Sequence, residues 1–287
     1  MEFLNKVFEQ RDKMISDSSK KLYTRNFNFL KEPKQILNMI KDYKPTTQRS
    51  YIIAICTVLK NSKHQNLYDM YFEILSNFNN QLKVRTDKTD KQMENWMTND
   101  NINDISKDLK SKVVKRVRNK EDYNNLLNYV VLSLYTLHPP RRNVDYSLMK
   151  ISNNMNDDKY NYLDMKKGQF VFNNYKTQGK YNTVVVPIEE NLMKIIKLYI
   201  NNHPEKSKLK NKNYNVHFLK SFYNEPIEKS QEITRILNKI FGKNIGSSML
   251  RNIYLSNKYS NVIEKLKDDT ASMGTSLEVA LSTYIKE

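Results

Sequence analysis

Residues 160–187 read YNYLDMKKGQFVFNNYKTQGKYNTVVVP, and this stretch decides the expected fold class. It contains three short apolar runs, at 160–165, 169–175 and 181–187, rich in aromatic and β-branched residues. Lys-Lys-Gly and Lys-Thr-Gln-Gly-Lys separate the runs. Apolar runs of this length with glycine-containing turns between them are typical of strands joined by hairpins. We therefore expect a small antiparallel β-sheet here.

On both sides of this stretch, apolar residues recur at the spacing of amphipathic helices. Proline and serine start signals support several of these helices. The expected helices cover residues 18–30, 33–40, 45–59, 65–82, 102–118, 119–137, 189–201, 231–241, 248–259, 261–267 and 276–285. The predicted fold class is therefore mainly α with a small antiparallel β-sheet, that is, α+β.

A polar segment predicts a division into two domains. Residues 83–95 contain almost no apolar side chains, which is typical of a connection between domains. We expect a helical domain at 1–90, a linker at 91–99 and a second domain at 100–287. Trp96, the only tryptophan, is expected to anchor the start of the second domain in its core.

The net charge of +17 is the strongest global signal. Lysine and arginine are spread along the chain, so the folded protein repels itself unless a polyanion is bound. Nucleic acid is the commonest partner of that kind. Codon usage in an AT-rich genome, association with the ribosome and association with a membrane surface are the alternatives.

Other sequence features favour an intracellular, soluble protein. No apolar stretch approaches the roughly 20 residues of a membrane span. The first residues lack the apolar core of a signal peptide. A single cysteine, Cys56, excludes an internal disulfide and fits a reducing compartment. Cys56 lies in an apolar run, which predicts a buried structural thiol.

Three motifs far apart in the chain carry residues suited to phosphate chemistry. They are Pro139-Pro-Arg-Arg142-Asn-Val-Asp145, Gly246-Ser-Ser-Met-Leu-Arg251, and Tyr284 on an amphipathic run. Lys176 lies between the two arginines in sequence. Arginine binds two phosphate oxygens at once and keeps its charge, and a tyrosine attacks phosphorus reversibly because a phenolate is a good leaving group. Together, these residue types could cut DNA through a phosphotyrosine.

These motifs resemble those of the tyrosine recombinase (phage integrase) family, and the resemblance covers nearly the whole chain. It implies a SAM-like core-binding domain followed by a catalytic domain. It also implies that Tyr284 is the nucleophile, that Arg142 (rather than Arg141) and Arg251 hold the phosphate, and that Lys176 is the general acid. Lys180, on the same turn, is the rival for the last role.

Two positions differ from the family. Ser248 stands where the family has His, Thr275 stands where it has His or Trp, and both are possible auxiliary residues. A hydroxyl donates a hydrogen bond but cannot hold a proton near neutral pH. Ser248 as a helix N-cap, and Thr275 with Glu278 as a capping box, are the structural alternatives. His138, close to Arg142 in sequence, is a weak candidate to take over the role of the missing histidines.

Asp145 is expected to orient its neighbouring arginine and not to act as a base. The sequence contains no Cys/His ligand cluster and no glycine-rich phosphate loop. We therefore expect no metal, no cofactor and no small-molecule substrate.

The resemblance implies a site-specific recombinase or integrase that forms a 3′-phosphotyrosyl intermediate. Its partners would be double-stranded DNA and, as a homotetramer, three further copies of the chain on two DNA sites. In the family, the two domains close around the duplex as a clamp. The alternatives are a type IB topoisomerase-like enzyme and a non-catalytic DNA-binding derivative. The composition resembles integrases of large DNA viruses and virophages, which would place the protein in host cytoplasm, a viral factory or the nucleus.

Overall fold

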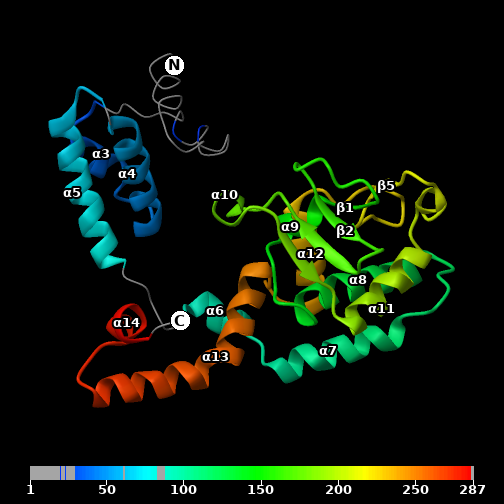
Figure 1. Cartoon of the computed structure of the whole chain (residues 1–287). Helices are drawn as coiled ribbons and strands as arrows, with labels where there is room; N and C mark the ends of the chain where they lie inside the picture. The colour runs from blue at the N-terminus through cyan, green and yellow to red at the C-terminus, as the bar shows by residue number, and fades with distance from the viewer. Residues whose placement is uncertain (1–19, 21–22, 24–29, 61, 83–87, 286–287) are drawn as a thin grey trace. The chain divides into compact units, whose positions relative to one another are not determined.

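The computed structural model describes residues 20, 23, 30–60, 62–82 and 88–285, and the chain divides into two compact units after Lys88 (Figure 1). The predicted helix at 18–30 lies mostly outside the described residues. Helix α6 (Asp90–Asn95) opens the second unit, in the segment where the sequence predicts a linker. The side chain of Asn95 accepts a hydrogen bond from the backbone N–H of Asn244 at 2.8 Å, which ties α6 to that unit.

The first unit contains helices α3 (Pro33–Ile40), α4 (Pro45–Leu59) and α5 (Gln65–Gln81). A proline begins α3 and another begins α4, where its missing N–H leaves no intrahelical hydrogen bond unmade. The core of this unit is aliphatic around a buried Tyr71. Cys56 is buried in it, so the prediction of a buried structural thiol is confirmed, and burial raises the pKa of the thiol to about 11.

Helix α8 (Lys120–Thr136) is the central helix of the second unit. Most of its side chains are buried, because α7 (Asn99–Lys112), α11 (Glu190–Asn201) and α12 (Ser230–Phe241) all pack against it. Trp96 packs against the same core and is partly buried, as predicted. Among the described residues, no helix has the length and apolar character needed to cross a membrane.

The sheet of the second unit has five strands in the order β4-β3-β2-β1-β5. The strands are β1 (Met149–Ser152), β2 (Asn161–Asp164), β3 (Gln169–Phe172), β4 (Val184–Pro187) and β5 (Asn215–His217). The three strands predicted from the sequence are present, and β2, β3 and β4 are antiparallel. Gly168, at φ +64°, occupies the left-handed conformation that the β2–β3 turn needs.

The prediction of a wholly antiparallel sheet is wrong, because β1 pairs with β2 in parallel. The chain returns over residues 153–160 to the starting end of β1 before β2 begins. Strand β5 then pairs antiparallel with the other edge of β1. The sheet is therefore mixed, and the fold belongs to the α+β class.

Helix α13 (Ser247–Ser272) is one continuous helix, where the sequence predicts two. Residues 260 and 261 are polar but neither is Gly or Pro, so nothing there breaks the helix. Figure 1 shows α13 starting beside α12 and running away from the sheet. The short helix α14 (Leu277–Val279) and a π-helical turn, η2 (Ala280–Tyr284), follow it.

Candidate functional site

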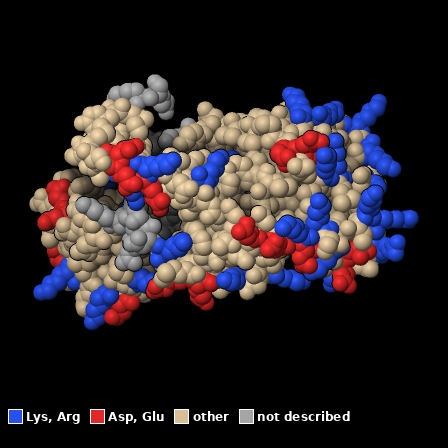
Figure 2. All heavy atoms as spheres, turned by 90° about the horizontal axis from the view of Figure 1, so that it is seen from below, with Lys and Arg blue, Asp and Glu red and all other residues tan. Residues whose placement is uncertain are grey.

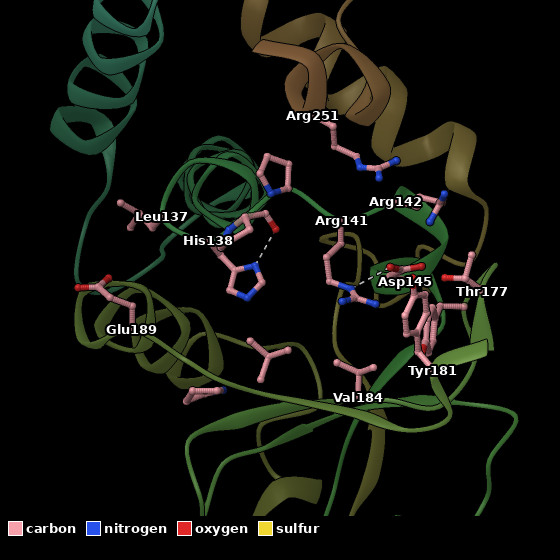
Figure 3. Close-up of a pocket in the computed structure, with 15 residues that line it drawn as sticks. Leu137, His138, Arg141, Arg142, Asp145, Thr177, Tyr181, Val184, Glu189 and Arg251 are labelled. Atoms are coloured by element: carbon pink, nitrogen blue, oxygen red, sulfur yellow. Dashed lines mark hydrogen bonds and ion pairs between the residues drawn. The ribbon is translucent and has the colours of Figure 1, made fainter. Parts of the chain in front are cut away.

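A pocket of about 580 Å³ opens in the second unit. Its walls come from the α8–α9 connection, where α9 is Asn143–Ser147, from the β3–β4 connection, from β4 and from α13 (Figure 3). The β3–β4 connection includes the short helix α10 (Gln178–Tyr181). The pocket therefore gathers segments that are far apart in sequence.

Arg142 and Arg251 both line this pocket, from different elements. Arg142 is the residue that precedes α9, and Arg251 lies in the second turn of α13. Figure 3 shows the Arg251 side chain extending from α13 toward the segment that carries Arg142. Both are half-buried, and neither guanidinium has a hydrogen bond or ion pair with any described residue. Two guanidinium groups in one pocket, neither held by an ion pair with a described residue, favour an anionic ligand with several oxygens, such as a phosphate.

Arg141, next in sequence, has a different environment. Its Nε donates to Oδ2 of Asp145 at 2.9 Å, and its guanidinium lies 3.7 Å from the centre of the Phe172 ring. The prediction that Asp145 orients a neighbouring arginine is confirmed, and Arg141 is that arginine. Burial raises the pKa of Asp145, and the charge of Arg141 opposes that rise. Because Arg141 is held in this way, Arg142 is the arginine available to a ligand.

His138 also lines the pocket and is buried. Its Nδ1 lies 2.9 Å from the carbonyl oxygen of Pro139, which can only accept, so Nδ1 carries the hydrogen. Burial lowers the pKa of the ring, which keeps it neutral. Its Nε2 is enclosed and has no partner among the described residues, and Figure 3 shows the ring turned away from Arg251. In this conformation His138 supplies no donor to an anion between the arginines.

Lys176 lies on the β3–β4 connection, beside the pocket. Its neighbours Tyr175 and Thr177 line the pocket, whereas Lys176 itself is exposed and does not line it. The hydroxyl of Tyr175 donates to the carbonyl of Asn182 at 2.8 Å and closes this connection into a compact loop. Lys180 is part of α10, but its side chain lies outside the described residues.

Ser248 is the second residue of α13 and is exposed. Gly246 is the N-cap of the helix, so the interpretation of Ser248 as an N-cap is wrong. The position of the cap is set by the extended backbone of Gly246, which the sequence pattern did not distinguish. Ser248 does not line the pocket.

Thr275 takes part in the end of α13. Its N–H donates to the carbonyl of Thr270 at 2.9 Å and the N–H of Gly274 donates to Ala271 at 3.0 Å. With Gly274 at φ +67°, these bonds form a Schellman motif. Ser276 then caps α14, so the predicted capping box based on Thr275 is wrong: the Schellman motif takes up Thr275 and moves the helix start by one residue.

Tyr284 is the last residue of η2, and the residue is 59% exposed. Neither Tyr284 nor Thr275 lines the pocket. The structure thus brings Arg142 and Arg251 together, places Lys176 on a connection that has other residues lining the pocket, and leaves Tyr284 outside.

Two hydroxyl-bearing residues that the sequence did not single out, Thr177 and Tyr181, also line the pocket. Thr177 follows Lys176 on the predicted turn, and Tyr181 begins the predicted strand after it, so closeness in sequence to Lys176 is the signal that identifies them. Glu189 lines the pocket as well, but its carboxylate accepts from the N–H of Leu192 at 3.3 Å as the cap of α11.

A scan against models of known protein families finds no match to the chain, and a search of curated proteins finds none either.

Proposed function

We propose that this protein is a tyrosine-type site-specific DNA recombinase or integrase, which cuts and rejoins DNA through a 3′-phosphotyrosyl intermediate. The observation that carries the proposal is the convergence of Arg142 and Arg251 in one pocket, where neither forms an ion pair with a described residue. The motif order Arg, Lys, Arg, Tyr, with Lys176 beside this pocket and Tyr284 downstream, supports it.

In the proposed reaction, Oη of Tyr284 attacks the scissile phosphorus and the P–O5′ bond breaks. The phenolic proton passes to solvent, and Lys176 donates a proton to the departing 5′ oxygen. Arg142 and Arg251 stabilise the additional negative charge on the phosphorane oxygens. The 5′ hydroxyl of a second strand then attacks the phosphotyrosine and restores the DNA backbone. Each step exchanges one phosphodiester linkage for another, so no nucleotide hydrolysis is needed to drive the reaction.

Because Tyr284 does not line the pocket, the reaction requires a rearrangement of the segment that follows α13 or the insertion of Tyr284 from a second copy. The proposed partners are double-stranded DNA and a homotetramer of this chain on two DNA sites, in an intracellular compartment. The second route uses that assembly directly, because the tetramer supplies the second copy.

Covalent trapping tests the proposal. The full chain is mixed with a DNA library that includes the sequences flanking its own gene, denatured, and analysed for protein-linked DNA. Tyr284→Phe is measured in parallel, and Tyr254→Phe is the matched control, because Tyr254 lies on the same helix as Arg251. We expect an adduct that Tyr284→Phe abolishes and Tyr254→Phe retains.

The outcome also separates the two alternatives. Relaxation of supercoiled DNA without exchange of strands between two sites would favour a type IB topoisomerase-like enzyme. Tight DNA binding with no adduct would favour a non-catalytic derivative, which the exposed position of Tyr284 outside the pocket also suggests.

A further inference from the structure

A second concentration of positive charge lies outside the pocket, on two connections of the second unit. Residues 110–120 contain six Lys or Arg, residues 206–212 contain four Lys, and neither segment contains Asp or Glu. The first segment joins the end of α7 to α8, and the second joins α11 to β5. Figure 2 shows Lys and Arg gathered at the end of this unit where Figure 1 places both connections.

Asn202 holds the two connections together. Its Oδ1 accepts from the N–H of Val117 at 3.1 Å, and its Nδ2 donates to the carbonyl of Lys115 at 3.2 Å. Val117, like Leu209 in the other connection, packs against the core. The apolar residues therefore anchor the backbone of both connections, and the cationic side chains between them are exposed to solvent.

Most of these cations are not neutralised. All ten are exposed. Lys112 pairs with Asp108 at 2.6 Å and Lys208 pairs with Glu205, which leaves eight of the ten without a carboxylate partner among the described residues. Lys110 and Lys112 also stabilise helix α7, because they complement its C-terminal dipole. The other cations without a carboxylate partner repel one another, and this repulsion destabilises the protein unless a polyanion covers them.

This surface is separate from the pocket. Lys120, at the start of α8, belongs to the surface, whereas Leu137 and the pocket-lining residues that follow it come directly after the end of α8. The 17 residues of α8 span about 25 Å at 1.5 Å per residue. One ligand phosphate therefore cannot occupy both places.

We propose that this distal basic surface, formed by the cations of residues 110–120 and 206–212, binds the sugar–phosphate backbone of duplex DNA independently of the Arg142–Arg251 pocket. Exposed cations spaced along two anchored connections suit the repeated phosphates of a duplex. An anionic membrane is the less suitable partner, because the apolar side chains of both segments turn inward, with Val114 the exposed exception. The choice of DNA over RNA rests on the proposed function; the anionic character of the ligand does not.

The test uses the full chain and two variants with the same loss of charge. Lys115→Gln/Arg116→Gln/Lys210→Gln removes three cations of the distal basic surface, all exposed and without a carboxylate partner among the described residues. The control, Lys166→Gln/Lys167→Gln/Lys194→Gln, removes three exposed cations elsewhere in the same unit. Binding of a fluorescent duplex is measured by anisotropy over roughly 50–200 mM salt, with thermal unfolding to verify that both variants fold.

We expect the first variant to bind at least about tenfold more weakly and to lower the slope of log K against log salt by up to about 2.7, or about 0.9 per contact. The control should change neither by a comparable amount. At saturating DNA the first variant should still form the covalent adduct. Arg142→Gln/Arg251→Gln should lose the adduct, and its DNA affinity should still fall when the three distal cations are also replaced. Failure of the proposed function and failure of this inference are thus distinguishable.

Three results would overturn the inference. The first is an equal loss of affinity in the control, and the second is an unchanged salt slope in the first variant. The third is a first variant that loses binding to phosphatidylserine vesicles or to an RNA duplex but still binds duplex DNA as the unchanged protein does.

Discussion

The same substitution at two adjacent arginines, Arg141 and Arg142, should damage different properties of the protein. Arg141 is 19% exposed at its side chain and forms a 2.9 Å ion pair with Asp145, whose side chain is 2% exposed. Arg142 is half-buried, and its side chain forms no hydrogen bond or ion pair with a described residue. Arg141→Gln should therefore damage the fold, and Arg142→Gln should damage ligand binding.

The expected magnitudes follow from these environments. Arg141→Gln leaves the carboxylate of Asp145 buried without its cation, which costs about 3 kcal/mol of unfolding free energy. Loss of the contact with the Phe172 ring adds about 0.5–1 kcal/mol. For a unit of this size, 3 kcal/mol corresponds to a fall in Tm of roughly 6–12 °C. Arg142→Gln should change stability by less than about 0.5 kcal/mol and weaken DNA binding by about 1.5–3 kcal/mol, roughly 10- to 150-fold.

Both effects can be measured in the full chain. Unfolding in urea is followed by the fluorescence of Trp96, the only tryptophan, which packs against the core of the second unit and so reports on that unit. DNA affinity is measured by anisotropy at one fixed salt concentration. The reasoning is refuted if Arg142→Gln destabilises as much as Arg141→Gln, or if Arg141→Gln leaves Tm unchanged.

Three further predictions concern the rest of the second unit. Burial lowers the pKa of His203 to about 4, below its unfolded value of about 6.5, so the unfolded state binds more protons between these values. Stability should fall by up to about 3 kcal/mol as pH drops through this window, and His203→Gln should flatten the fall in Trp96-monitored urea titrations. Gly274→Ala, at φ +67°, should weaken the Schellman motif by about 1 kcal/mol and speed amide exchange at Thr275, measured by hydrogen–deuterium exchange, with unchanged exchange counting against it. Asn202→Ala removes two hydrogen bonds to the α7–α8 connection and should accelerate tryptic cleavage there severalfold, and an unaltered digest would contradict the role of Asn202.

Much of the fold follows from local sequence patterns. Helices α3, α4, α8 and α11 lie within one residue of their predicted bounds, because proline starts or long apolar faces mark them. Strands β1 and β5 were missed because runs of four and three residues are too short to carry a period-two pattern. The parallel pairing of β1 with β2 depends on tertiary contacts, which no local pattern encodes.

The candidate site was predicted in part. The order of motifs identified Arg142 and Arg251, and the structure places both in one pocket. Which of the adjacent arginines would be free depended on where Asp145 lies in three dimensions, so the preference for Arg142 rested on resemblance and not on local propensity. Tyr284 was predicted as part of the site, but the long α13 and the turns after it leave its side chain outside the pocket.

Mapping the DNA-linked residue by mass spectrometry tests the central claim most directly. Trapped complexes are digested with nuclease and protease, and the peptide that carries a nucleotide 3′-phosphate is sequenced. The account predicts that the modification lies on Tyr284 and that Arg142→Gln and Arg251→Gln each abolish it. A nucleotide on another residue, or full modification in either arginine variant, would contradict the account.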